Sequence, residues 1–166
     1  MDFFKWLFAR LWKNFGVVTS GLYRSGQMGP IRLLITYLFV YPDIVIALNI
    51  EKNPPWKERF EEWVFKRLDA EWYKYNWGSS GPSENCEEEK KVIGLINESL
   101  DNGYKCYVHC AGGKDRTGGI IGYWYYDKGH DDLDFYIDQC IIHKTPWKGW
   151  TEFVVGRYYK NRRSVS

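Results

Sequence analysis

The sequence predicts an α/β protein, a three-layer sandwich in which helices flank a central, mostly parallel sheet of about 4–5 strands. Three observations predict this class. Strand-like and helix-like segments alternate over residues 44–126. The near-continuous apolar run Ile44–Ile50 is typical of a strand buried on both faces of a parallel sheet. A later apolar run, Cys106–Val108, opens into a glycine-rich turn and a helix start, and ligands of such sheets bind at this end of the strands.

The composition is that of one globular domain spanning residues 1–166. Hydrophobic residues make up 45% of the chain and charged residues 27%, which excludes a disordered protein. A formal net charge of +2 is too small to predict a nucleic-acid partner. No apolar run reaches the roughly 18 residues of a membrane span, and no signal-peptide cleavage site follows the N-terminus. The cysteines form no metal-ligand pattern, so we expect no metal and no other cofactor.

An amphipathic helix is predicted over residues 2–15. Its apolar residues recur at helical spacing, with Lys5 and Arg10 off the stripe. Two placements fit this pattern. The stripe can pack on the core of the domain, or it can lie in a membrane interface with its basic residues toward anionic lipid. The stripe consists of Phe3, Phe4, Leu7, Phe8, Leu11, Trp12 and Phe15.

The next segments build the first half of the sheet. Alternation around Val18 and Leu22 predicts a short strand pair. The apolar segment Ile31–Tyr41 predicts a helix that ends before Pro42. The buried strand Ile44–Ile50 follows, and a break at two prolines precedes a helix over Trp56–Leu68.

The second half repeats the alternation. Ala70–Trp77 predicts a strand, and a loop follows it. Ser83 is placed to cap a helix whose first turn is acidic and which ends at Asn102–Gly103. The strand Tyr104–His109 then leads into the glycine-rich turn. The remaining chain predicts helices over Thr117–Tyr126, Leu133–His143 and Thr151–Tyr159 and a solvated basic tail.

The turn itself carries residues that suit a phosphate ligand. Gly112 and Gly113 let the backbone curl, so that several amide N–H groups converge on one anion at a helix N-terminus. Arg116 offers a planar fork for two phosphate oxygens. The same amides and cation favour a thiolate at Cys110, which can attack a bound phosphorus in line.

The string HCAGGKDRTG, residues 109–118, resembles the signature loop of cysteine-dependent protein tyrosine and dual-specificity phosphatases of the compact bacterial or viral type. A second string, LYRSGQ at residues 22–27, is similar to the N-terminal block of the same phosphatases, so the resemblance extends over most of the domain. It implies a dual-specificity-phosphatase-like fold and a cysteinyl-phosphate intermediate. We interpret Arg24 in this block as structural, tying the loop to the sheet, rather than as a substrate ligand.

The resemblance also implies a role for each residue of the loop. Cys110 is the nucleophile, Arg116 binds the phosphoryl oxygens, and Thr117 hydrogen-bonds the thiolate. His109 points back from the strand end and hydrogen-bonds the loop backbone, a role that we favour over that of a catalytic base. Lys114 either adds positive charge at the mouth or faces solvent. The residues expected to bind the substrate phosphate are Ala111, Gly112, Gly113 and Lys114.

The general acid departs from the pattern of the family. These phosphatases carry an Asp on a mobile loop before the Cys, but residues 76–85 contain no Asp, and Glu84 is their one acid. We favour Asp115, since myotubularin-like phosphatases place an Asp before the Arg. Asp115 holding the loop together is the alternative, and Asp69 is more remote.

Three functions are consistent with these residues. The first is hydrolysis of phosphotyrosine or phosphoprotein substrates, with aromatic residues such as Trp77, Trp147 and Trp150 lining a cleft. The second is an inositol-phosphate or phosphoinositide phosphatase, with peripheral membrane contact through residues 2–15. The third is a phosphate-binding module without catalysis. A thiolate nucleophile favours the cytoplasm, and the sequence leaves open the oligomeric state and any disulfide of Cys110 with Cys86, Cys106 or Cys140.

Overall fold

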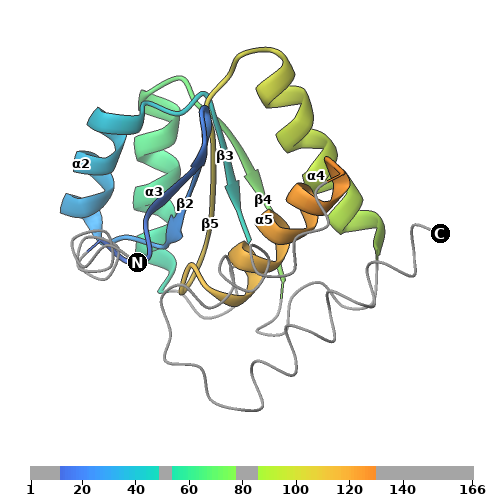
Figure 1. The fold of residues 1–166 in the computed structure, drawn as a ribbon. Helices are drawn as coiled ribbons and strands as arrows, with labels where there is room; N and C mark the ends of the chain where they lie inside the picture. Colours follow the sequence, from blue (N-terminus) through green and yellow to red (C-terminus); the bar gives the residue numbers. More distant parts are fainter. Residues whose placement is uncertain (1–11, 49–53, 78–85, 130–166) are drawn as a thin grey trace, which may run out of the picture.

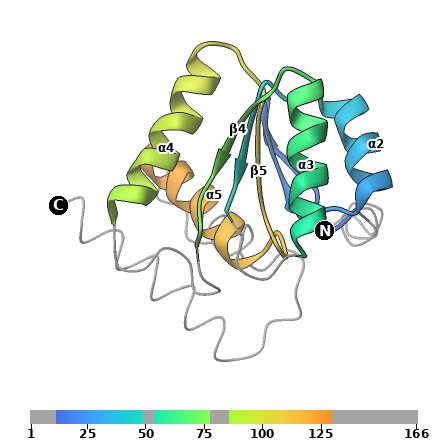
Figure 2. The ribbon, with the colours of Figure 1, turned by 180° about the vertical axis from the view of Figure 1, so that it is seen from behind.

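A five-stranded sheet forms the centre of the molecule. Its strands are β1 (Gly16–Thr19), β2 (Leu22–Gly26), β3 (Ile44–Ala47), β4 (Glu71–Lys74) and β5 (Cys106–Cys110), and their order across the sheet is β1-β2-β5-β3-β4. The computed structural model describes residues 12–48, 54–77 and 86–129. Helices cover both faces of the sheet (Figures 1 and 2). This arrangement confirms the predicted three-layer α/β sandwich.

The strands are close to those that the sequence predicts. β2 pairs in parallel with β5, β5 with β3, and β3 with β4, whereas β1 runs antiparallel to β2 at one edge. β5 therefore lies in the middle of the sheet, with a parallel neighbour on each side.

The helices of the described residues lie on both faces of the sheet (Figure 1). α2 (Pro30–Val40) and α3 (Pro55–Arg67) cover one face, and α4 (Cys86–Asp101) and α5 (Asp115–Asp127) cover the other. α2 and α3 both begin at a proline, whose fixed φ suits the first helical position. The helices predicted beyond residue 129 and the cap at Ser83 lie outside the described residues.

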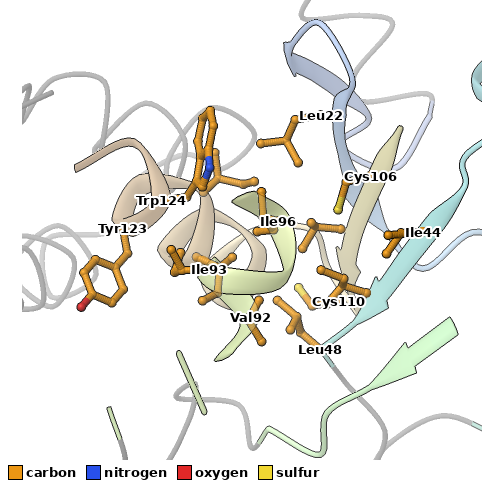
Figure 3. Packing of buried hydrophobic residues seen from close by; sticks show 14 of the residues in the cluster. Leu22, Ile44, Leu48, Val92, Ile93, Ile96, Cys106, Cys110, Tyr123 and Trp124 are labelled. Atoms are coloured by element: carbon orange, nitrogen blue, oxygen red, sulfur yellow. The ribbon is translucent and has the colours of Figure 1, made fainter. Parts of the chain in front are cut away.

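Alternation along β5 divides the core into two clusters. Cys106, Val108 and Cys110 face the side of α4 and α5, where they pack with residues such as Val92 and Ile96 (Figure 3). Tyr107 faces the opposite side and packs against α2 and α3. Side chains of successive residues point to opposite faces of a strand, so the residue before Cys110 is directed toward α2 and α3.

The N-terminal segment differs from its prediction. The predicted helix over residues 2–15 is described only from residue 12 onward, and these residues are not helical. Lys13 and Asn14 both have left-handed backbone, with φ of 55° and 62°. A helix cannot pass through two such residues, so the prediction is wrong for its last residues. Among the described residues, no helix combines the length and apolar character that crossing a bilayer requires.

Candidate active site

The glycine-rich turn joins the end of β5 to the start of α5, at the carboxyl edge of the parallel strands. Gly113 has a φ of +66°, and a Cβ there would lie 2.2 Å from the peptide nitrogen of Gly26 on β2. Only glycine satisfies both constraints. β2 pairs with β5 up to Gly26 and Cys110, so the loop rests on the end of β2.

Cys110 lies beneath this loop. Its side chain is buried, and the Gly113 N–H donates to its Sγ over 3.2 Å. An amide hydrogen directed at sulfur, beside the N-terminus of a 13-residue helix, stabilises negative charge there. The contact makes the loop suited both to a thiolate and to an anionic ligand above it.

Two side chains hold the carbonyl groups of the loop. Arg24 Nη2 donates to the Gly113 carbonyl oxygen over 2.6 Å, and Asn14 Nδ2 donates to that of Gly112 over 2.5 Å. Both side chains are buried. When the carbonyl groups of a loop accept hydrogen bonds from outside it, the amide groups between them can point to the inside of the loop and converge on one anion. Arg24 therefore holds the loop, in keeping with the structural role that we preferred.

Arg116 lies in the first turn of α5, and its Nη1 donates to the carbonyl oxygen of Trp77 over 2.6 Å. The indole Nε1 of Trp77 in turn donates to Glu88 on α4. This indole is only 2% exposed and packs in the core, so it does not line an open cleft as the sequence suggested. Trp77 instead holds the Arg116 guanidinium in place through its carbonyl oxygen.

Thr117 and His109 lie differently from what the resemblance implied. The Thr117 hydroxyl is fully buried but has no hydrogen-bond partner among the described residues, Cys110 included. His109 is also buried, and its ring makes no bond to the loop backbone. Its Nε2 lies 3.1 Å from Glu61 Oε1 on α3, which is ion-pair distance. The ring N–H is not aligned on that oxygen, so the contact is electrostatic rather than a well-formed hydrogen bond.

Burial and charge act in opposite directions on His109. Burial lowers the pKa of its imidazole below the usual 6.5, and the neighbouring Glu61 partly opposes this shift. We give burial the greater weight because the ring is almost completely enclosed. The imidazole is therefore neutral near pH 7 and enclosed in the core, so it does not titrate freely as a catalytic base would.

The acid candidates are only partly within the described structure. Asp115 begins α5, directly before Arg116, but its side chain lies outside the described part, as does the whole of Glu84. Asp69 precedes β4 at the amino edge of the parallel strands. Asp69 and the loop therefore lie at opposite edges of the sheet, with the length of a strand between them.

Positive side chains gather beside the loop. The stem of Lys13 lies against Gly26, where an added Cβ would be 2.8 Å from Lys13 Cγ. Burial lowers the pKa of the Lys13 ammonium, and the charges of Lys57, Arg32 and Lys114 lower it further, whereas Cys110 raises it. The ammonium is thus within electrostatic range of Cys110 and of three other cations. The sequence prediction missed Lys13, because it assigned this residue to a helix.

Cys106 and Cys110 are both free thiols. They are four residues apart on one strand, which at about 3.3 Å per residue is roughly 13 Å. A disulfide needs Cα atoms less than about 7 Å apart, so Cys106 cannot pair with Cys110. Burial raises the pKa of Cys106 to about 12, and this thiol stays protonated.

Comparison with known proteins identifies the fold. Models of protein families give no match, and neither do curated proteins. Solved structures match. Tk-PTP in its active form has a TM-score of 0.66 and 17% identity, over 88% of this chain and 97% of that chain. PTPMT1 in complex with PI(5)P has a TM-score of 0.64 and 12% identity, over 92% of this chain and 99% of that chain. The core catalytic domain of the PP-IP phosphatase SIW14 from S. cerevisiae has a TM-score of 0.65 and 19% identity, over 86% of this chain and 83% of that chain.

The chain therefore has the fold of cysteine-based phosphatases. Identities of 12–19% establish the fold alone. The residues of the loop are consistent with the chemistry of such enzymes.

Proposed function

We propose that this protein is a cysteine-dependent phosphatase that hydrolyses phosphomonoesters, in the first place phosphotyrosine in phosphoproteins. One observation carries the proposal. The sulfur of Cys110 accepts the Gly113 N–H inside a loop that feeds the N-terminus of α5, with Arg116 in the first turn of that helix. A thiolate and an anion-binding loop in this order suit in-line attack on a phosphate.

The reaction has two steps. The Cys110 thiolate attacks phosphorus, the P–O bond to the leaving group breaks, and the leaving oxygen takes a proton from an acid. Water then attacks the cysteinyl phosphate and gives its proton to the deprotonated acid, the P–S bond breaks, and inorganic phosphate leaves with the thiolate restored. Arg116 opposes the charge of the transition state. Its guanidinium has five donors, so it can keep one on Trp77 while others bind phosphate.

We assign the acid to Asp115, which precedes Arg116 at the start of α5. Glu84 is the alternative. If neither acts as the acid, substrates with good leaving groups should react far faster than alkyl phosphates, because their leaving oxygens need no proton.

The test is the pH–rate profile of p-nitrophenyl phosphate hydrolysis in chelator, for wild type, Cys110→Ser and Asp115→Asn. Turnover that disappears in Cys110→Ser supports the proposal. Loss of the basic limb in Asp115→Asn supports its role as the acid, and an unchanged profile leaves Glu84 as the acid or no acid at all. A wild-type protein that binds phosphate but turns nothing over would favour a binding module instead.

The positive side chains beside the loop favour a second candidate substrate, an inositol phosphate or phosphoinositide. Lys13 is within electrostatic range of Cys110 and of Arg32, Lys57 and Lys114, so further phosphates of a substrate bound at Cys110 would meet positive charge. Among the proteins of similar fold, PTPMT1 is seen with PI(5)P and SIW14 is a PP-IP phosphatase. The ratio of kcat/KM on an inositol bisphosphate to that on a phosphotyrosine peptide distinguishes the two candidates.

A further inference from the structure

A buried carboxylate lies on α3, which packs on the face of the sheet toward which His109 points. Glu61, in the middle of α3, is only 3% exposed. The adjacent Glu62 instead pairs with Lys66 on the surface. Removing a carboxylate from water costs several kcal/mol unless the protein supplies compensating partners. The partners of Glu61 therefore indicate what the burial achieves.

Both partners adjoin the peptide of the nucleophile. Glu61 Oε2 accepts a hydrogen bond from Gln27 Nε2 over 3.0 Å, and Glu61 Oε1 lies 3.1 Å from His109 Nε2. The backbone N–H of Gln27 donates to the Cys110 carbonyl oxygen over 2.7 Å. His109 is the residue directly before Cys110. One carboxylate thus bridges the two segments that fix the position of Cys110.

We infer that Glu61 is a positioning residue for the nucleophile, acting through Gln27 and His109 on the peptide of Cys110. The inference rests on the proposed phosphatase function. It divides the support of the loop into two parts. Arg24 and Asn14 hold the phosphate-binding amides through Gly113 and Gly112, and Glu61 holds the sulfur in line.

This division predicts a particular kinetic signature. Loss of Glu61 should misalign Cys110 while leaving the anion-binding amides in place. A displacement of about 1 Å at a reacting atom costs on the order of 100-fold in rate. We therefore expect kcat to fall and the affinity for inorganic phosphate to stay the same.

The decisive variant is Glu61→Met, which keeps the length of the side chain and removes its acceptors. For p-nitrophenyl phosphate we expect kcat to fall about 10- to 100-fold, with the inhibition constant of inorganic phosphate unchanged. Glu61→Gln should restore most of the lost kcat, because its oxygen can face His109 while the Gln27 amide turns to accept its N–H. Glu62→Met, one position along the same helix, is the control and should keep wild-type kcat.

A spectroscopic readout separates positioning from general loosening of the fold. In wild type, the Glu61 carboxylate 3.1 Å from Nε2 should electrostatically favour the His109 tautomer that carries its proton on Nε2, and a ¹⁵N spectrum of the ring reports this tautomer. Glu61→Met should change the tautomer population with the cooperative unfolding transition retained. A folded Glu61→Met protein with wild-type kcat and an unchanged His109 tautomer would overturn the inference.

If Glu61→Met does not fold, Gln27→Met is the variant to measure, because it removes one partner of Glu61 and leaves the backbone hydrogen bond to Cys110 in place. A lowered kcat in Gln27→Met supports the inference, and an unchanged kcat overturns it. If wild type hydrolyses nothing, the proposed function fails. The His109 tautomer and the rate of Cys110 alkylation then test the bridge on their own, and values that are the same in Glu61→Met and wild type overturn it.

Discussion

Gly113 of the loop and Gly26 at the end of β2 touch backbone to backbone, with no room for a side chain between them. Gly113→Ala would place a methyl group 2.2 Å from the Gly26 nitrogen and would also strain a φ of +66°. We expect a loss of at least about 2 kcal/mol in the free energy of unfolding and near-complete loss of turnover. Urea denaturation and p-nitrophenyl phosphate hydrolysis measure the two effects.

The control for this substitution is Gly94→Ala. Gly94 lies within α4, and no atom is within 4 Å of its ideal Cβ. Alanine in a helix interior should raise the free energy of unfolding by about 0.5–1 kcal/mol. Equal effects at the two positions would contradict the close contact at Gly113.

Arg24→Met removes the donor that holds the Gly113 carbonyl. A buried carbonyl without a partner costs about 1–3 kcal/mol, and the loop amides lose their orientation. We therefore expect a higher KM for p-nitrophenyl phosphate and a weaker inhibition by inorganic phosphate. Arg59→Met, at an exposed position of α3, should change neither constant.

The stability of the protein should fall in mild acid because of His109. Burial depresses the pKa of this imidazole below 6.5 in the folded state, with Glu61 opposing and the ring of Tyr107 packed beside it. Above pH 6.5 the imidazole is neutral in both states, so its contribution is fully present. Below that pH only the unfolded chain takes up the proton, and stability declines by up to about 1.4 kcal/mol per pH unit.

Thermal melting of wild type and His109→Gln between pH 8 and pH 5 measures this contribution. The melting temperature of wild type should fall as the pH drops below 6.5, and His109→Gln should show a smaller fall. Two parallel curves would mean that other groups cause the acid sensitivity.

Lys13→Met tests the charges beside the loop. The variant should lower kcat/KM for an inositol bisphosphate about 10-fold and affect p-nitrophenyl phosphate less, because the second phosphate loses its cation. Added salt should reduce the difference. Lys66→Met, whose lysine pairs with Glu62 on the surface, is the control. An equal loss on both substrates would count against a second phosphate position.

The two free cysteines of β5 should react very differently. Iodoacetate at neutral pH should modify Cys110, whereas Cys106, with its pKa raised to about 12 by burial, should stay unmodified in the folded protein. Peptide mapping after a short exposure locates the label. Protection of Cys110 by inorganic phosphate would connect the reactive thiol with the anion site, and equal labelling of Cys106 would contradict its burial.

Much of the fold could be predicted because the signals for its strands and its turn lie within short stretches of the sequence. The β-branched run of β3 and the apolar run of β5 predicted two central strands, and the glycine-rich turn predicted the loop between β5 and α5. These signals are short-range, since period, turn residues and helix caps act within a few positions. Position in the sheet then followed from general rules of parallel α/β proteins.

The support of the loop could not be predicted in the same way. Glu61 lies in a charged helical segment, and nothing in its neighbours distinguishes it from Glu62, which pairs with Lys66 on the surface. Its burial depends on Gln27 and His109, which are 34 and 48 positions away. The left-handed turn at Lys13 and Asn14 was hidden by a regular apolar stripe, because tertiary bonds to the loop and to β2 override the local helical preference.

The central position of β5 also has a consequence for how the molecule folds. Leu22 of β2 pairs with Cys106 of β5 across 84 positions of the chain. Such long-range parallel pairing closes a large loop before it gains contacts, so it forms slowly compared with local helices. The helices can therefore form early, while the bond from Arg24 to Gly113 must wait for the sheet. After dilution from urea, we expect helical circular dichroism to recover before phosphatase activity.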